Sequence, residues 1–249
     1  MKIIILCAGI GSRLKHLTKE NPKCLVNVNG VSILGRLLIQ LFKLGLTEKD
    51  IFLCSGYKSE ALQFKYTKFL NKRFRTTNMM ETTIIGIQSL NIKKDSQEKI
   101  LVIYGDCIYS YESINKIFKN LNNKNEIIIP VDLDWKDKWS KRYPNIYEDA
   151  ETLEYDLSSK KLISIGNKTY IEEEYMAQFM GIYIIPQNLI SNFLNSYRNF
   201  PNKIREKMST TEFFNKTKKT INYLVMPDSY QWTEVDTLED LNYAKKMFP

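Results

Sequence analysis

Two glycines near the amino terminus stand where a loop could hold phosphate groups. Gly9 and Gly11 directly follow the apolar run 2–7, whose shortness and β-branched residues predict a buried strand. Glycines at such a strand end let the backbone approach a ligand closely, and their N–H groups can bind phosphate oxygens. Arg13 and Lys23 follow a few residues further on. N–H groups beside two fixed cations suit a triphosphate.

Other glycine-loop chemistries fit this stretch less well. A glycine pair after a strand often serves packing alone, so it is weak as a sole signal. The dinucleotide pattern G-x-G-x-x-G fails because Leu14 stands at the third glycine position. A Walker A loop fails because no Gly-Lys-Ser/Thr follows. A nicotinamide-dependent oxidoreductase is therefore a weaker hypothesis than a nucleoside triphosphate site.

Two aspartates far apart in the chain are candidate metal ligands. Asp106 follows Gly105 at the end of a predicted strand, 100–104, and Asp236 precedes the last predicted helix, 238–247. Each has a plainer interpretation as the cap of the helix that follows it. Because open α/β sheets collect ligand groups at strand ends, the two carboxylates could instead share one Mg²⁺ with phosphate oxygens and water.

Charged and aromatic residues gather after the predicted strand 126–131. Asp132 comes first, and Trp135, Trp139 and Arg142 follow at helical spacing. Such a face could bind a small charged substrate, although amphipathic packing on the sheet explains the spacing equally well. A guanidinium suits a carboxylate, whereas tryptophan rings suit a quaternary ammonium.

The elements that must position these residues alternate between strand and helix in the first half, which predicts a parallel sheet with helices on its faces. The expected strands lie at 2–7, 51–55, near Phe74, 100–104 and 126–131, and the helices at 34–41, 61–70, 84–90 and up to 121. After Pro130 we expect strands at 152–155, 162–165, 176–185 and 221–225, with helices at 189–197, 211–216 and 238–247. No linker or repeat separates the halves, so we predict one domain over 1–249.

The predicted fold class is α/β, a mixed but mainly parallel Rossmann-like sheet flanked by helices, with an antiparallel lid insertion over it. Residues 1–131 would form the nucleotide-binding half and 132–249 the acceptor-binding and lid half.

Composition excludes several classes of protein. The chain has 36 Lys and Arg against 28 Asp and Glu, a net charge of +8, but the basic residues are scattered doublets without a block. This favours an anionic small-molecule ligand over nucleic acid, although a non-catalytic RNA- or nucleotide-binding module remains an alternative. His16 is the only histidine, which excludes a His-based zinc site, and the four cysteines form no C-x-x-C pair. No apolar run could span a bilayer, so we expect a cytoplasmic protein without a membrane partner.

The stretch A-G-x-G-S-R-L, followed by P-K-x-L, resembles the signature of the sugar-nucleotidyltransferase superfamily. Members join a nucleoside triphosphate to a phosphorylated acceptor and release pyrophosphate. The resemblance implies catalytic roles for Lys23 and Arg13, Mg²⁺ as cofactor with Asp106 and Asp236 as its ligands, and a structural role for Glu234. It implies nucleotide contacts from a wider set: Leu6, Ala8, Gly9, Gly11, Ser12, Arg13, Lys23, Asn78, Thr82, Gly105 and Asp106.

Segment 77–82 resembles the T-N-M-x-x-S stretch of bacterial cytidylyltransferases that act on choline phosphate, phosphonates and related acceptors. In that family the stretch lies against cytosine, whose edge needs both hydrogen-bond donors and acceptors. The likeness is closest to members that act on phosphoglutamine for capsule phosphoramidate biosynthesis. It implies CTP as donor and L-glutamine phosphate as acceptor, in a monomer or small homo-oligomer, with choline phosphate, a phosphonate or a sugar 1-phosphate as alternative acceptors. The expected acceptor contacts are Arg142, Lys168, Asp132 and Trp135.

Overall fold

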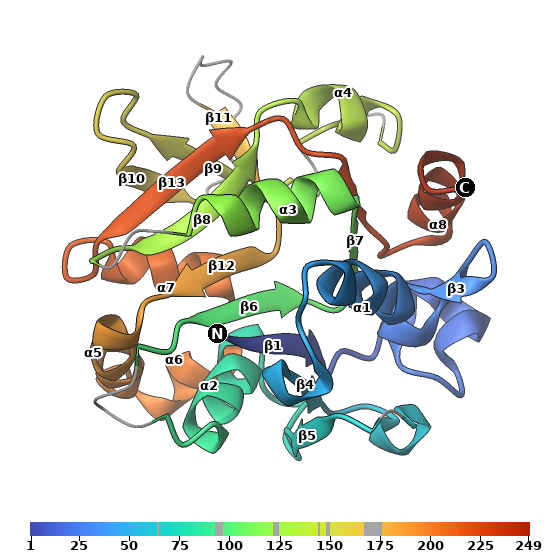
Figure 1. The fold of residues 1–249 in the computed structure, drawn as a ribbon, viewed down its shortest axis with the longest axis horizontal. Helices are drawn as coiled ribbons and strands as arrows, with labels where there is room; N and C mark the ends of the chain where they lie inside the picture. Colours follow the sequence, from blue (N-terminus) through green and yellow to red (C-terminus); the bar gives the residue numbers. More distant parts are fainter. Residues whose placement is uncertain (64, 93–96, 122–124, 144, 148–149, 167–175) are drawn as a thin grey trace.

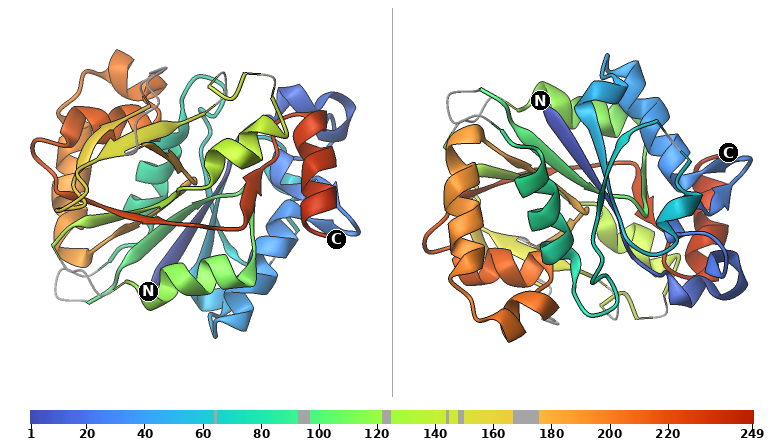
Figure 2. Two further views of the ribbon diagram at one scale, coloured as in Figure 1. Left: turned by 90° about the horizontal axis from the view of Figure 1, so that it is seen from above. Right: turned by 90° about the horizontal axis from the view of Figure 1, so that it is seen from below.

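A ten-stranded sheet forms the centre of the molecule, and helices cover both of its faces (Figures 1 and 2). The computed structural model describes residues 1–249 except 64, 93–96, 122–124, 144, 148–149 and 167–175. The strand order is β10 (Leu162–Ile165), β9 (Thr152–Tyr155), β11 (Met176–Phe179), β8 (Ile127–Asp132), β12 (Ile182–Ile185), β6 (Ile100–Tyr104), β1 (Lys2–Cys7), β4 (Ile51–Ser55) and β5 (Thr67–Leu70). A further strand, β13 (Tyr223–Asp228), runs parallel to β8.

The parallel core of the sheet arises from strands that are apolar on both faces. β1 pairs in parallel with β4 on one side and β6 on the other, and Ile3, Ile4 and Ile5 are fully buried in it. Helices cover both faces of such strands, so their sequences read as continuous apolar runs. The predicted strands 2–7, 51–55 and 100–104 are confirmed.

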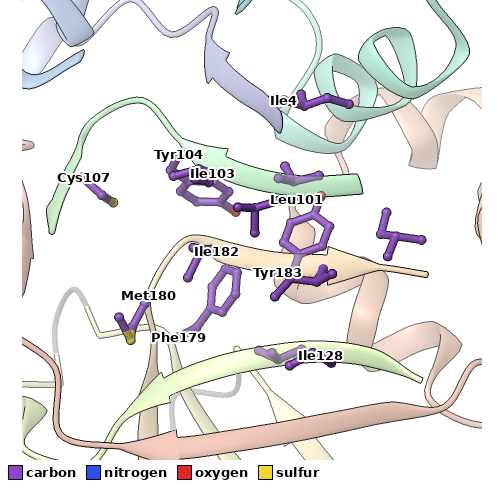
Figure 3. Close-up of a cluster of buried hydrophobic side chains, with 14 of the residues drawn as sticks. Ile4, Leu101, Ile103, Tyr104, Cys107, Ile128, Phe179, Met180, Ile182 and Tyr183 are labelled. Carbon is purple, nitrogen blue, oxygen red and sulfur yellow. The ribbon is translucent and has the colours of Figure 1, made fainter. Parts of the chain in front are cut away.

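The predicted strand 176–185 is two strands, and the break between them decides the topology of the sheet. Gly181 adopts φ +67, and a Cβ there would lie 2.7 Å from the ring of Tyr104. After this corner, β12 runs antiparallel between β6 and β8, where Tyr183 joins the cluster that also holds Tyr104 and Phe179 (Figure 3). A strand from the second half of the chain therefore lies between two strands of the first half.

The antiparallel strands predicted for the second half are present. β11 pairs antiparallel with the end of β8, and β9 and β10 continue outward from β11. At its far end this branch of the sheet returns to β13, where the N–H of Val225 donates to the carbonyl of Lys160 at 2.8 Å and Lys161 forms a bridge with Leu224. The strands therefore satisfy their backbone hydrogen bonds against one another, β8 and β13.

Helices α1 (Ile33–Lys43) and α3 (Tyr111–Lys119) lie together on one face of the sheet, and α2 (Met79–Ser89), α5 (Gln187–Arg198), α6 (Asn202–Lys207) and α7 (Thr210–Thr217) gather on the other (Figure 2). Near the carboxyl terminus, α8 (Leu238–Met247) packs beside the hairpin β2 (Asn27–Val28) and β3 (Val31–Ser32), where Leu241, Val28 and Ile33 share a second, smaller core. No helix in the described part of the chain is both long and apolar enough to cross a membrane.

Two predicted elements are wrong. The segment expected as a helix at 61–70 is a short 3₁₀ turn, Ser59–Ala61, and then the edge strand β5. Pairing with β4 and stacking of Phe69 on Phe52, with ring centroids 5.7 Å apart, stabilise the extended form. Phe74, expected in a strand, lies in the loop that leads from β5 to α2.

Gly181→Ala should lower the free energy of unfolding by about 2–4 kcal/mol, because it adds a clash with Tyr104 to the strain of a left-handed backbone. Gly45→Ala is the matched control: Gly45 also has positive φ, at +82, but a Cβ there meets nothing within 4 Å. Urea unfolding of both variants checks this. Equal losses at the two positions would mean that the close approach to Tyr104 contributes nothing.

Candidate active site

Two cations and two carboxylates meet at the carboxyl end of the parallel strands. Lys23 Nζ donates to Asp106 Oδ2 at 2.7 Å and also to Asp236 Oδ1. Arg13 Nη2 lies 3.0 Å from the same oxygen of Asp236. The four side chains come from the loop after β1, the turn after β6 and the segment before α8. Residues more than 200 positions apart in the chain therefore form one charge cluster.

A small two-stranded sheet brings the two aspartates together. β7 (Cys107–Tyr109) begins directly after Asp106, and β14 (Trp232–Glu234) ends two residues before Asp236. The strands pair antiparallel with Glu234 opposite Cys107, and the N–H of Val235 donates to the carbonyl of Asp106. Because this register is held by backbone hydrogen bonds, the spacing of the carboxylates is built into the fold.

The electrostatics of the cluster favour the charged forms of Lys23 and Asp236. Burial alone would lower the pKa of Lys23, but the attraction of Asp106 and Asp236 outweighs it and raises that pKa above its ordinary value. Burial would raise the pKa of Asp236, yet the charges of Lys23, Arg13 and Arg142 lower it. Lys23 is therefore a permanent cation at neutral pH, as a group that faces phosphate must be.

Gly11 is required by the position of Lys23. Its φ is +67, and a Cβ would lie 2.8 Å from Lys23 Cβ and 3.1 Å from Thr18 Cγ2. The hydroxyl of Thr18 also donates to the carbonyl of Gly11 at 2.9 Å. Gly9, by contrast, would meet nothing within 4 Å, so its open side is available to a ligand. Ser12 follows Gly11 directly and is the first residue of the 3₁₀ segment Ser12–Thr18, which contains Arg13.

Asp106 and Asp236 have the chemistry of a magnesium site. Both already converge on a single cation, the ammonium of Lys23, and carboxylate oxygens are the ligands that Mg²⁺ prefers. Within the described ranges no group of three or more His, Cys, Asp or Glu side chains gathers to hold a metal. Two carboxylates fit Mg²⁺ when phosphate oxygens and water complete its shell.

A pocket beside the charge cluster is formed by three chain segments. The end of β1 contributes Leu6, Ala8 and Gly9, the end of β6 contributes Tyr104 and Asp106, and the loop before α2 with its first turn contributes Phe74, Thr77, Asn78, Met79 and Thr82. An adjoining smaller cavity shares Leu6, Gly9 and Asp106 and adds Cys7, Lys23, Cys24 and Gly105. The structure thus brings together residues expected to contact a nucleotide. Phe74 and Tyr104 were not predicted as pocket residues, since a single aromatic residue in a loop or at a strand end carries no separate sequence signal.

Asn78 is more constrained than its sequence suggests. Its Oδ1 accepts from the N–H of Met79 at 2.7 Å, and its Nδ2 donates to the carbonyl of Lys207 at 3.1 Å. Its own N–H donates to the carbonyl of Glu206. Asn78 therefore caps the start of α2 and connects it to α6. Among the described residues one hydrogen of its amide has no acceptor, so it is available to a ligand.

Three of the residues expected to bind an acceptor, Arg142, Asp132 and Trp135, do not line these cavities. Asp132 is fully buried and accepts from Trp232 Nε1 at 3.0 Å and from Lys138. Trp135, the first residue of α4 (Trp135–Ser140), is fully buried against the rings of Trp139 and Tyr147. Lys168 lies outside the described residues. In the described structure, packing accounts for the helical spacing of these aromatic residues.

Arg142 is buried and is connected through Asp240 to the backbone of Asp236. Its guanidinium stacks between the rings of Trp139 and Tyr143, 4.4 and 5.0 Å from their centroids, and its Nε donates to Asp240 Oδ1 at 2.8 Å. Asp240 Oδ2 in turn accepts the N–H groups of Asp236 and Thr237 at 3.0 and 2.9 Å. Asp240, which no sequence motif singled out for this role, thus holds the backbone of the candidate metal ligand.

Comparison with known proteins agrees with this geometry. Residues 3–171 match the family described as MobA-like NTP transferase domain. The chain belongs to this family. It is also 30% identical over 254 residues to the CTP:phosphoglutamine cytidylyltransferase of Campylobacter jejuni subsp. jejuni serotype O:2, across 97% of this chain and 98% of that protein.

Two solved structures show that the NTP transferase fold extends over the whole chain. The inositol-1-phosphate CTP transferase from T. maritima matches with a TM-score of 0.72 and 18% identity over 99% of this chain and 95% of that one. The CTP:phosphocholine cytidylyltransferase from Streptococcus pneumoniae matches with a TM-score of 0.68 and 17% identity over 100% and 99%. The mixed α/β fold predicted from the sequence is confirmed.

Asp240→Ala should lower the free energy of unfolding by about 3–5 kcal/mol, because it leaves the buried charge of Arg142 without its closest partner. Glu212→Ala is the control, since Glu212 pairs with Lys216 on the surface of α7 and both side chains are 44% exposed. Its loss should stay below about 1 kcal/mol. Urea unfolding compares the two. A loss at Asp240 no larger than that at Glu212 would contradict the supporting role of the buried pair.

Proposed function

We propose that this protein transfers the cytidylyl group of CTP to L-glutamine phosphate and releases pyrophosphate. The convergence of Lys23, Arg13, Asp106 and Asp236 beside the pocket supports a nucleotidyl transfer. The identity to the Campylobacter enzyme over nearly the full length of both chains supports the choice of CTP and phosphoglutamine. Residues 1–131 would supply most of the nucleotide site and 132–249 the acceptor site of one domain.

The reaction needs positioning and charge neutralisation more than acid–base chemistry. A phosphate oxygen of the acceptor attacks the α-phosphorus of CTP in line; the new P–O bond forms as the bond to the β-phosphate oxygen breaks, and pyrophosphate leaves with that electron pair. An anionic phosphate is already a nucleophile, so no general base is required. Lys23 and Arg13 would neutralise charge on the reacting phosphates.

The carboxylates have a double role in this proposal. Asp106 and Asp236 would hold Mg²⁺, which when bound neutralises phosphate charge. In the described structure they hold Lys23 instead. Lys23 must therefore exchange a carboxylate partner for a phosphate oxygen when the substrate arrives. The pairing keeps the ammonium in the site until then.

The proposed acceptor preference rests on how far the aromatic rings near Arg142 are buried or covered. A quaternary ammonium needs open ring faces, but Trp135 and Trp139 are fully buried. The face of Tyr143 already carries the guanidinium of Arg142. These rings therefore do not form an open cage for choline phosphate, which favours the amino-acid phosphate. The contacts of Arg142, Asp132, Trp135 and Lys168 with the acceptor stay predictions.

Turnover measured as pyrophosphate release tests the proposal. With CTP and Mg²⁺, L-glutamine phosphate should give a larger kcat/KM than choline phosphate, a phosphonate or a hexose 1-phosphate. EDTA should stop the reaction, and added Mg²⁺ should restore it. Faster turnover of choline phosphate or a sugar phosphate would contradict the assignment of L-glutamine phosphate as acceptor. Full activity in EDTA would contradict the requirement for Mg²⁺.

Lys23→Ala should lower kcat by roughly 10²–10³-fold, because charge develops on the oxygens of the α-phosphate only in the transition state. Lys216→Ala removes a lysine from the surface of α7 and should leave kcat near that of the parent. Steady-state kinetics of both variants with CTP and L-glutamine phosphate make the comparison. If Lys23→Ala turns over at the parent rate, Lys23 does not have the proposed role in the reaction.

A further inference from the structure

A buried amide, that of Asn71, connects three groups at the edge of the nucleotide pocket. Asn71 follows β5, is 1% exposed, and is held by its N–H, which donates to the carbonyl of Ser55 at 2.9 Å. Its side-chain Nδ2 donates to Thr77 Oγ1 at 3.0 Å and to Thr82 Oγ1 at 2.9 Å. Both threonines line the pocket. Asn71 itself does not, so its influence on a ligand must pass through these two hydroxyls.

The orientation of this amide is determined by a neighbour that can only donate. The N–H of Arg73 lies 2.9 Å from Asn71 Oδ1, and a backbone N–H requires an acceptor. The carbonyl oxygen of the amide must therefore face Arg73. Its NH₂ group consequently faces the threonine hydroxyls, and each hydroxyl oxygen accepts one of its hydrogens.

The hydroxyl protons of Thr77 and Thr82 then differ in whether the protein offers them an acceptor. Thr77 donates its proton to the carbonyl of Arg73 at 2.9 Å. Among the described residues, the hydroxyl of Thr82 accepts from Asn71 and donates no hydrogen bond. The Thr82 side chain is buried at the pocket wall, with the residue 4% exposed. A ligand in the pocket is thus the partner available to that proton.

We propose that Asn71 is a positioning residue that makes Thr82 a proton donor toward N3 of the pyrimidine, and so sets a preference for cytosine over uracil. This inference rests on the proposed function. N3 of cytosine is an acceptor, whereas N3 of uracil carries a hydrogen. Uracil would leave the Thr82 proton without a partner in a buried place, and that costs binding.

The test is the ratio of kcat/KM for CTP to kcat/KM for UTP with L-glutamine phosphate. Asn71→Asp keeps the shape but replaces the NH₂ by an acceptor, so the Thr82 proton should turn toward residue 71 and away from the base. The ratio should fall roughly tenfold or more, the factor that corresponds to about 1.4 kcal/mol. Thr82→Val removes the hydroxyl and should lower the ratio as well. In the Thr82→Val background, Asn71→Asp should change it no further.

Thr77→Val is the matched control, since the proton of Thr77 already points to Arg73, and the CTP:UTP ratio should not change. An unchanged ratio in a folded Asn71→Asp variant would overturn the proposal, as would an equal fall in the Thr82→Val background or in Thr77→Val. If Asn71→Asp does not fold, an unchanged ratio in Thr82→Val overturns it alone. If the parent turns over neither nucleotide, the proposed function fails separately. In that case the preference for CTP over UTP is measured for each variant as the ratio of the two dissociation constants, determined by calorimetry.

Discussion

The burial of one ammonium group organises this molecule. Lys23 is 8% exposed, and a buried charge is tolerated only where opposite charges compensate for the water it has lost. Asp106 and Asp236 provide that compensation, so the loop after β1, the turn after β6 and the segment before α8 must meet at one point. The same requirement determines the need for glycine at position 11, where no side chain fits beside Lys23.

Much of the surrounding fold can be understood as the means of delivering those three segments. Parallel pairing of β1 with β6 sets their carboxyl ends side by side, and the β7–β14 pair carries Asp236 back to Asp106. The Arg142–Asp240 pair then holds the Asp236 backbone in place. Each device adds backbone or charge-assisted hydrogen bonds, which are directional, to a core that apolar packing alone would leave less defined.

Single buried polar side chains organise both walls of the site. Asp240 is fully buried and accepts hydrogen bonds from a guanidinium and two backbone N–H groups. Asn71 has the corresponding role beside the pocket, where it connects the loop after β5 to the first turn of α2. In both places a buried residue holds a side chain or backbone segment that we propose to contact the ligand, so substitution of Asp240 or Asn71 would act through Asp236 or Thr82.

The sequence by itself determined the local elements and the chemistry they carry. Short continuous apolar runs predicted β1, β4 and β6, because both faces of these strands are buried, and an apolar face with a 3.6-residue period predicted helix α1. The glycine loop, Lys23, Asp106 and Asp236 were recognisable by type and spacing. Only the tertiary structure decided that β12 lies between β6 and β8, that Trp135 and Arg142 are interior, and that Asn71 and Asp240 connect to the site. These features depend on contacts between residues distant in the chain, and a linear pattern of residue types does not encode which partner each buried group will meet.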